Sequence, residues 1–464
     1  PAAAREVPVP EQIPNPTHTP AVPASARRVI DALEDAGFET WMVGGCVRDA
    51  LLGRPVNDID LACAAHWQDT QRVCEAAGMR TFETGVAHGT LTVEADGTTF
   101  EVTTFRTDGA YTDARHPDAV RFVADVREDL ARRDFTMNAI AFHPDRGLLD
   151  PFGGRNDIEA GTIRAVGDPS LRFREDALRI LRGVRFASQL GFAIEPATEA
   201  GMLDARNLLR KVSAERVAHE LDAMLLGDHI HDAIMGYPGV LEAVVPELGP
   251  MRGLDQLTKY HIYDVLEHSA WACQLIPATP LLRWTALLHD VGKPSTFFTD
   301  DNGIGHFYGH AEAGVDIAAG ALKRLKKSPR FIHDVRLLVR YHDTPVPAQP
   351  KYVKHMLRMF DGRIDLVRAL CDVKRADSAA HAPRYQSGIR LANDIDACLD
   401  EIVAKDEAFT LNQLALNGTD IMALGVTAGP SVGRILRAAL AAVIDGKVAN
   451  VHDDVVAYVR DRLI

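Results

Sequence analysis

Two aspartates separated by one residue, Asp58 and Asp60, are suited to phosphate chemistry. The apolar run Ile59–Cys63 predicts a β-strand, and side chains two residues apart on a strand share a face. Two adjacent carboxylates repel each other unless a cation lies between them. Hard oxygen ligands of this kind are what Mg²⁺ prefers beside phosphates. Taken alone, the pair also fits a solvated strand end.

A double glycine upstream favours the phosphate interpretation. Gly44 and Gly45 stand between a short β run, Thr40–Val43, and a predicted helix, Val47–Leu52. Glycine lets the backbone approach a triphosphate closely, and the start of a helix attracts anions. Arg48 adds a planar fork of donors. A strand-to-helix turn with these residues is typical of a nucleotide site.

A predicted hairpin carries a third acid. The runs Thr90–Glu94 and Thr98–Phe105 flank Asp96 and Gly97, a dipeptide typical of a two-residue hairpin turn. Glu101 lies on the second strand and could join the two aspartates on one sheet. A solvent-facing strand glutamate is the alternative.

The rest of the pattern indicates a small mixed domain followed by a long helical body. Residues 1–24 contain seven prolines and predict a disordered leader. The predicted elements then begin with a helix over Ser25–Ala36, and Val126–Phe142 predicts a helix leading into a strand. From about residue 170 the apolar period is 3.6, which predicts helices. The fold class expected is α+β.

Composition sets few limits. The chain has 464 residues and a net charge of −13, which is unusual for a nucleic-acid binder unless basic residues gather locally. No apolar run approaches the roughly 20 residues that span a bilayer, and no signal peptide is recognisable. The six cysteines are scattered, which favours a reducing cytoplasm without disulfides or a zinc ribbon. We therefore expect a cytoplasmic protein without a membrane partner.

A local basic run does occur, with six arginines between Arg164 and Arg185. Within a predicted helix, Arg174–Leu190, four residues recur every third position: Asp176, Arg179, Arg182 and Arg185. Asp176 can accept hydrogen bonds and Arg179 can donate them, so the two could present an edge to an incoming base. Arg182 and Arg185 could meet a triphosphate. An exposed helix with Asp–Arg pairs is the alternative.

A second set of residues is suited to metal binding. Imidazole and carboxylate ligands together suit a divalent transition metal or Mg²⁺. The set comprises His268, His289, Asp290, His310, His342 and Asp377. A structural domain without metal is the alternative.

Five stretches, in this order, resemble the motifs of the class II tRNA nucleotidyltransferase and bacterial poly(A) polymerase group, within the polymerase-β-like nucleotidyltransferases. They are residues 44–60, 132–139, 150–154, 174–179 and 212–216. The ordered His/Asp set resembles the HD phosphohydrolase superfamily, with His310 and His342 completing the ligands of its dinuclear forms.

The resemblance implies a polymerase-β-like head followed by an extended helical neck, body and tail. The expected divisions are a leader over 1–24, a nucleotidyltransferase head over 25–167, a neck and RNA-binding region over 168–254, an HD domain over 255–380 and a tail over 381–464.

The resemblance also implies template-independent addition of CCA to the 3′ end of tRNA from CTP and ATP, by two-metal transfer with Mg²⁺. Asp58 and Asp60 would hold the metals, and Glu101 would assist. The residues expected to bind the nucleotide are Gly44, Gly45, Arg48, Arg133, Asp134, Asn138, Asp176, Arg179, Arg182 and Arg185.

For the HD domain, the resemblance implies a second divalent metal (Ni, Mn, Co, Fe or Mg) and hydrolysis of cyclic or terminal phosphates, which would repair RNA ends. Two other functions stay open: a poly(A) polymerase, or an HD phosphohydrolase whose head only binds RNA. The segment Thr107–Pro117 resembles the intact loop of CCA-adding members, and Leu416–Asp420 resembles the tail of tRNA-specific members. Both favour CCA addition.

Overall fold

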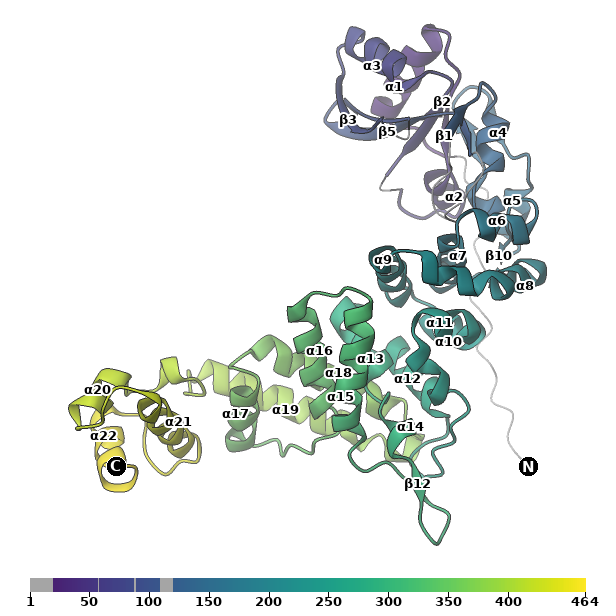
Figure 1. The fold of residues 1–464 in the computed structure, drawn as a ribbon. Coiled ribbons are helices and arrows are strands. Elements are labelled where there is room, and N and C mark those ends of the chain that lie inside the picture. The colour runs from purple at the N-terminus through teal and green to yellow at the C-terminus, as the bar shows by residue number, and fades with distance from the viewer. Residues whose placement is uncertain (1–19, 57, 87–88, 109–119) are drawn as a thin grey trace. The chain divides into compact units, whose positions relative to one another are not determined.

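The structure, a computed structural model, describes residues 20–56, 58–86, 89–108 and 120–464 (Figure 1). Most of the predicted leader lies outside the described residues. So do residues 109–117 of the segment that resembles the loop of CCA-adding members. Contacts divide the chain into two compact units. One runs up to Ala233 and includes Gly239–Val244, and the other comprises Ile234–Pro238 and Val245–Ile464.

The first unit is built on a seven-stranded sheet with the order β3-β4-β5-β2-β1-β8-β9. Only β2 and β5 are parallel neighbours, and the other adjacent pairs are antiparallel. The strands are β1 (Thr40–Val43), β2 (Asp60–Cys63), β3 (Arg80–Gly85), β4 (Thr90–Ala95), β5 (Thr98–Thr104), β8 (Ala141–His143) and β9 (Gly147–Leu149).

Both faces of the sheet are covered, so every residue of β1 is buried. Helices α1 (Ala24–Asp35) and α3 (Trp67–Ala76) pack together against the strands, and α2 (Gly45–Leu51) follows β1 directly. On the other side, Trp41 and other strand residues pack on α4 (Val126–Ala131). The sheet is therefore a rigid support for residues at the ends of its strands.

The predicted hairpin is confirmed, because β4 and β5 pair in continuous register around Asp96 and Gly97, which both have positive φ. The predicted helix over Val126–Phe142 is wrong beyond Ala131. After α4 the backbone pairs with a distant segment: the Thr136 amide donates to Arg164 O at 2.9 Å, and the Val166 amide donates to Asp134 O at 3.1 Å. These long-range bonds replace helical ones and are followed by a short 3₁₀ helix, η2 (Thr136–Asn138).

The predicted helix over Arg174–Leu190 is also two helices. Helix α6 (Pro169–Glu175) ends before Asp176, which is extended at φ −138°, and α7 (Leu178–Leu190) begins after it. The Asp176 side chain accepts a 3.0 Å hydrogen bond from the Leu178 amide. Asp176 therefore caps α7 from the junction and does not lie on the helix with the arginines.

The second unit is mostly helical, as expected, and contains one short hairpin of β12 (Phe298–Thr299) and β13 (Gly305–His306). Its principal helices are α12 (Val265–Leu275), α13 (Pro280–Leu288), α14 (Lys293–Thr296), α15 (His310–Arg324), α16 (Pro329–Tyr341), α17 (Pro350–Met359), α18 (Ile364–Ala379), α19 (Ser387–Ala404), α20 (Gly418–Ala423), α21 (Pro430–Ile444) and α22 (His452–Arg462). The α+β fold class is thus confirmed. Among the helices that the structure describes, none is long and apolar enough to cross a membrane.

Candidate active sites

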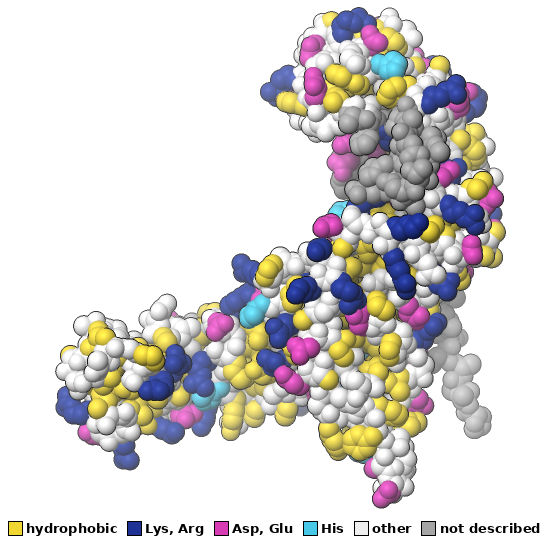
Figure 2. Space-filling view, in the orientation of Figure 1, with side chains coloured by type: hydrophobic (Ala, Val, Ile, Leu, Met, Phe, Trp, Pro, Cys, Tyr) yellow, Lys and Arg dark blue, Asp and Glu magenta, His cyan; other side chains and the backbone are white. Residues whose placement is uncertain are grey.

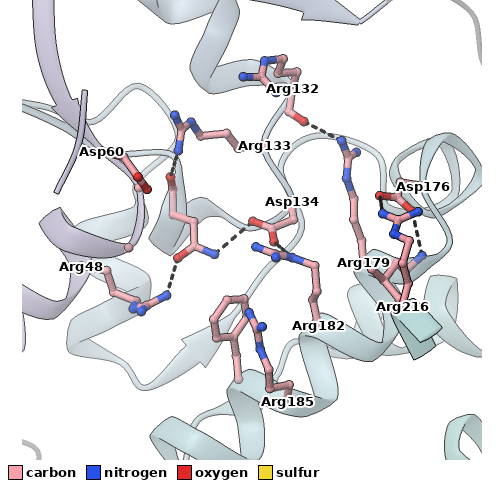
Figure 3. A pocket seen from close by; sticks show the side chains of 15 residues that line it. Arg48, Asp60, Arg132, Arg133, Asp134, Asp176, Arg179, Arg182, Arg185 and Arg216 are labelled. Carbon is pink, nitrogen blue, oxygen red and sulfur yellow. Dashed lines mark hydrogen bonds and ion pairs between the residues drawn. The ribbon is translucent and has the colours of Figure 1, made fainter. Parts of the chain in front are cut away.

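A cavity of about 460 Å³ opens in the first unit between the sheet and α7 (Figure 3). Seven arginines and three aspartates are among its lining residues, so it is locally basic although the chain is acidic. On the face shown in Figure 2, by contrast, basic and acidic side chains are interspersed. The cavity is lined by Asp60, predicted to hold metal, and by all ten residues that the sequence predicted for nucleotide binding: Gly44, Gly45, Arg48, Arg133, Asp134, Asn138, Asp176, Arg179, Arg182 and Arg185.

The buried Asp134 carboxylate lies at the centre of the polar contacts in this cavity. Its Oδ2 accepts a 2.7 Å hydrogen bond from Arg182 on α7, and its Oδ1 accepts one of 3.0 Å from the Asn138 amide. The Asn138 side-chain oxygen in turn accepts from Arg48 at 2.7 Å. One carboxylate therefore connects the arginine after the double glycine with an arginine of the neck helix.

The charges around Asp134 keep it ionised. Burial alone would raise the pKa of Asp134, but the Arg182 guanidinium and the Asn138 amide hold it well below its usual range. The same contact raises the pKa of Arg182. Both groups therefore keep their charges across the physiological pH range.

Arg179 and Asp176 are each held in place by neighbours. Arg179 donates to the backbone oxygen of Arg132 at 2.9 Å and to the Glu175 carboxylate at 2.8 Å. Asp176 accepts from Arg216 at 3.1 Å. Because these partners fix the guanidinium and the carboxylate, the two side chains can present a preformed set of donors and acceptors to a base.

Gly44 has to be glycine for two reasons. Its φ is +77°, and a Cβ at this position would lie 2.6 Å from Arg133 Nη1. Arg133 is itself anchored by the buried Asp129 carboxylate at 3.2 Å. The turn between β1 and α2 therefore lets a guanidinium lie directly against the backbone.

Four cavity residues were not among the sequence-predicted sites: Arg132, Leu178, Phe186 and Arg216. Phe186 is the most informative, because the guanidinium carbons of Arg185 and Arg48 lie 4.5 and 5.0 Å from the centre of its ring. An aromatic residue directly after the arginine run was the available signal. It supports the arginines by cation–π contact without using their hydrogen-bond donors.

The acids beside the cavity lie on, or just before, the neighbouring interior strands β2 and β5. Asp60 begins β2 and pairs in register with Glu101 on β5, so both side chains share a face. The strand begins at Asp60, so Asp58 precedes it and does not lie on it as predicted. Desolvation by the surrounding protein and the charges of Glu101 and Asp58 raise the pKa of Asp60, while Arg133 opposes the shift. Three mutually repelling carboxylates fit a divalent cation.

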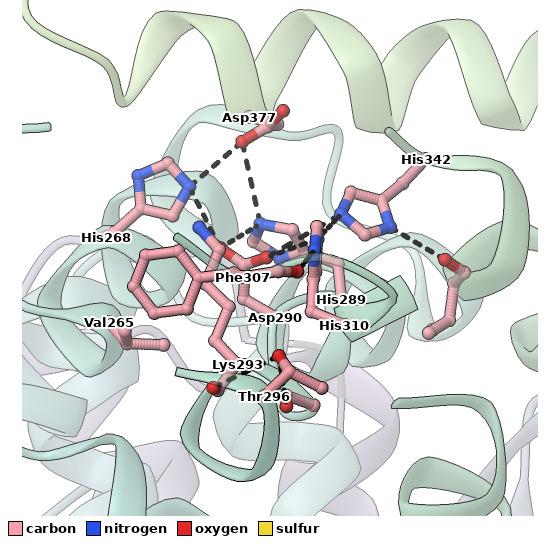
Figure 4. A network of polar contacts seen from close by, with 12 residues as sticks. Val265, His268, His289, Asp290, Lys293, Thr296, Phe307, His310, His342 and Asp377 are labelled. Carbon is pink, nitrogen blue, oxygen red and sulfur yellow. Dashed lines mark hydrogen bonds and ion pairs between the residues drawn. The ribbon is translucent and has the colours of Figure 1, made fainter. Parts of the chain in front are cut away.

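The second unit brings together all six predicted HD residues (Figure 4). Asp290 lies between two groups of imidazoles. On one side, its Oδ2 is 3.2 Å from His289 Nε2 and 3.6 Å from His268 Nε2. On the other side, its Oδ1 is 3.4 Å from His310 Nε2 and 3.6 Å from His342 Nε2. Asp377 lies 2.9 Å from His268 Nε2 and 3.6 Å from His289 Nε2.

Backbone contacts orient three of the imidazoles for metal binding. The Nδ1 atoms of His289, His310 and His342 lie 2.8, 2.9 and 2.7 Å from the carbonyl oxygens three residues before them. Donation to those oxygens fixes each ring with its Nε2 directed at Asp290, where it can bind a metal once it is deprotonated. The His289 Nε2 and both Asp290 oxygens are buried without a well-oriented hydrogen bond. The donor set, which includes His289, Asp290 and His342, therefore fits a divalent cation.

Close packing makes this arrangement possible. A Cβ on Gly292 would lie 2.1 Å from His310 O, so only glycine lets the start of α15 approach the turn after Asp290. Lys293 was not predicted as a site residue, and its Nζ lies 2.7 Å from Asp290 Oδ2. His261 and His381, also not predicted, flank His268 with ring centroids 5.0 and 5.4 Å away.

Protons occupy this centre when no cation is bound. Burial would lower the pKa of His289, but Asp290 and Asp377 raise it to about 10. A bound cation would replace that proton, because a metal ligand must be deprotonated.

An arginine-lined cavity beside three carboxylates defines a nucleotidyltransferase, and comparison with known proteins agrees. Residues 40–164 match the poly(A) polymerase head domain, 191–251 match a probable RNA- and SrmB-binding site of polymerase A, and 258–380 match the HD domain. Both the head and the HD domain imply the use of divalent metal.

Individual relatives align with this chain over almost its whole length. The chain is 34% identical to the CCA-adding enzyme of Lactiplantibacillus plantarum over 96% of this chain and 97% of the relative. It is 33% identical to that of Limosilactobacillus fermentum over 93% and 95%. The crystal structure of the Bacillus stearothermophilus CCA-adding enzyme in complex with CTP matches with a TM-score of 0.69 and 30% identity, covering 95% of this chain and 97% of that one. The chain belongs to the family of CCA-adding enzymes.

The Asp134 contacts predict a pH-dependent loss of stability in the Asp134→Asn variant. The ionised carboxylate stabilises the fold above its unfolded pKa, near 3.8, and this contribution is lost as the pH falls toward the lowered native value. We expect the variant to lose about 1–2 kcal/mol at pH 7, because Arg182 is partly exposed. Urea unfolding should give a constant difference between pH 7 and pH 5 and a smaller one below pH 4. A difference that grows on acidification would contradict the assignment.

Proposed function

We propose that this chain adds CCA to the 3′ end of tRNA from CTP and ATP without a nucleic-acid template. The observation that carries the proposal is the arginine-lined cavity next to Asp60 and Glu101, in a chain that aligns nearly end to end with CCA-adding enzymes. A relative with 30% identity binds CTP. Poly(A) addition is the alternative, but the relatives described above are CCA-adding enzymes.

In this proposal the three acids on and before β2 and β5 take part in the nucleotidyl transfer. Asp58 and Asp60 would hold Mg²⁺, with Glu101 beside them, and the metal supplies charge stabilisation for the attacking and leaving oxygens when bound. The terminal 3′-hydroxyl of the RNA gives up its proton to solvent as its oxygen bonds to the α-phosphorus, and the bond from that phosphorus to the oxygen bridging to the β-phosphorus breaks. Pyrophosphate leaves, and the RNA is longer by one nucleotide.

The cavity would hold the nucleotide. Gly44 and Gly45 allow close approach of the phosphates, while Arg48, Arg133 and Arg185 compensate their charge. Asp134, positioned by Asn138 and Arg182, is placed to accept from a ribose hydroxyl. Asp176 and Arg179 would select the base, because each is held by other residues before the nucleotide arrives.

An extension assay on a tRNA transcript lacking its last three nucleotides tests this function. With CTP alone we expect two added residues, and with CTP and ATP together CCA and then a stop. Asp60→Asn should lower the rate by at least a thousandfold, because the metal loses a ligand, whereas Asp69→Asn on α3 should leave it unchanged. A long tail from ATP alone would replace the proposal with poly(A) addition. Nucleotide addition at the wild-type rate by Asp60→Asn would show that the Asp60 carboxylate does not take part in the reaction.

The second unit supports a second activity, the hydrolysis of phosphate esters at RNA ends. Four imidazoles converge on Asp290 with their Nε2 atoms directed inward, and Asp377 lies beside two of them. Metals bound there would activate water, whose oxygen bonds to phosphorus while the bond from phosphorus to the ribose oxygen breaks. The ribose oxygen takes up a proton, and inorganic phosphate or an opened cyclic phosphate results. Because four imidazoles are present, we propose Mn, Ni, Co or Fe before Mg.

Replacing Asp290 or His342 should separate hydrolysis from nucleotide addition. We expect Asp290→Asn and His342→Gln to lose metal content, measured by elemental analysis, and hydrolysis of a 3′-phosphorylated RNA. Nucleotide addition should stay within twofold of wild type. His333→Gln, on the same helix as His342 but 58% exposed, is the matched control. Retained metal and hydrolysis in both site variants would refute this proposal.

We further propose that the chain works in the cytoplasm. All six cysteines are free and buried, which suits a reducing compartment where tRNA is processed.

A further inference from the structure

Three aromatic rings share one face of the β12–β13 hairpin. Phe298 and His306 are cross-strand partners, and their rings stack with centroids 5.3 Å apart. Tyr308, two residues beyond His306, stacks on it with centroids 5.3 Å apart. We call Phe298, His306 and Tyr308 the hairpin triad.

The triad is open to solvent although its rings are large and apolar. Tyr308 is 74% exposed and Phe298 is 47% exposed. By contrast, the neighbouring rings of Phe297 and Phe307, on the same segment, pack against each other with centroids 5.2 Å apart. The hairpin therefore presents ring faces that its own fold does not cover.

Two of the three triad residues border the HD centre. His306 and Tyr308 line a cavity of about 380 Å³ whose other walls include Asp290, Lys293 and His310. A second cavity of about 290 Å³ shares Tyr260, His342 and Asp377 with the first and adds Tyr385. Tyr260 and Tyr385 pack edge to face with centroids 4.9 Å apart. Aromatic rings thus line both cavities that reach the metal-ligand cluster.

We propose that the hairpin triad stacks on the last bases of a single-stranded RNA end and so delivers its terminal phosphate to the HD centre. This inference rests on the proposed hydrolase function and names its substrate. Aromatic faces bind unpaired bases by stacking, independent of base identity. Lys293 and the metal-ligand cluster lie at the inner end of the same cavity, where a phosphate would arrive.

The arrangement favours a strand end over a free nucleotide. A lone nucleotide offers one base, whereas the hairpin offers three adjacent rings, and Tyr260 of the Tyr260–Tyr385 pair lines the same cavity as His306 and Tyr308. More than one base can therefore be stacked while one phosphate is held. Side chains that read base edges are not required, so the expected substrate is an RNA end of any sequence.

The test compares a short RNA carrying a 3′-phosphate with p-nitrophenyl phosphate, which has no base, in the metal-loaded full chain. We expect the double variant Phe298→Ala/Tyr308→Ala to raise KM for the RNA at least fivefold and to leave hydrolysis of p-nitrophenyl phosphate within twofold. Tyr308→Phe, which keeps the ring, and Ile304→Ala, an exposed aliphatic residue of the same hairpin, should behave like wild type. A nucleoside 3′-monophosphate should have a higher KM than the RNA.

A second measurement does not depend on hydrolysis. An RNA ending in 5-iodouridine 3′-phosphate should photo-cross-link to residues 298–308 of the full chain in the presence of a chelator, and the double variant should lose that cross-link. If the wild-type chain hydrolyses nothing but still gives this cross-link, the proposed hydrolase activity is rejected, whereas base stacking on the hairpin triad is retained. Three results would each overturn the inference. They are an unchanged KM for RNA in the double variant, cross-links confined to other segments, and a mononucleotide that binds as well as RNA.

Discussion

The buried Asp134 carboxylate is the contact on which the first active site depends. It comes from a segment that leaves helical geometry to pair with residues 164–166, and it holds Arg182 of α7 at 2.7 Å. Through Asn138 it also fixes Arg48. Desolvating an aspartate is unfavourable unless charges and hydrogen bonds compensate it, so the carboxylate and its partners stabilise one arrangement of the cavity. The donors that a nucleotide would meet are therefore in place before it binds, which is the condition for electrostatic selection and catalysis.

The HD centre follows the same principle with different chemistry. Backbone carbonyls face the Nδ1 atoms of three histidines, so the Nε2 atoms converge on Asp290. Gly292 allows the two helical segments to approach closely enough for this convergence. In both centres the side chains that would meet substrate are held by other groups of the chain. That makes substitution of the supporting residues as informative as substitution of the ligands.

Sequence patterns predicted the sheet, the hairpin at Asp96 and Gly97 and the helical second unit, because these depend on local periodicity and turn chemistry. They failed where long-range pairing overrides propensity: Val126–Phe142 stops being helical once residues 134–136 bond to 164–166, and Asp176 breaks a predicted helix by capping the next one. Most candidate residues were found because linked motifs place them in one cavity. Phe186 was missed although it directly follows the arginine run, and Lys293 was missed because a buried ammonium has no signature until its partner is known in space.

The central claim is that a preformed protein network, and not a nucleic-acid template, selects the nucleotide. The most direct measurement is the ratio of kcat/KM for CTP over UTP on a tRNA lacking CCA, in the wild-type chain and in Arg216→Gln. The account predicts a high ratio in the wild type and a fall of at least tenfold in the variant, because Asp176 loses the guanidinium that fixes it. A variant that adds nucleotides more slowly but discriminates as well as the wild type would contradict it.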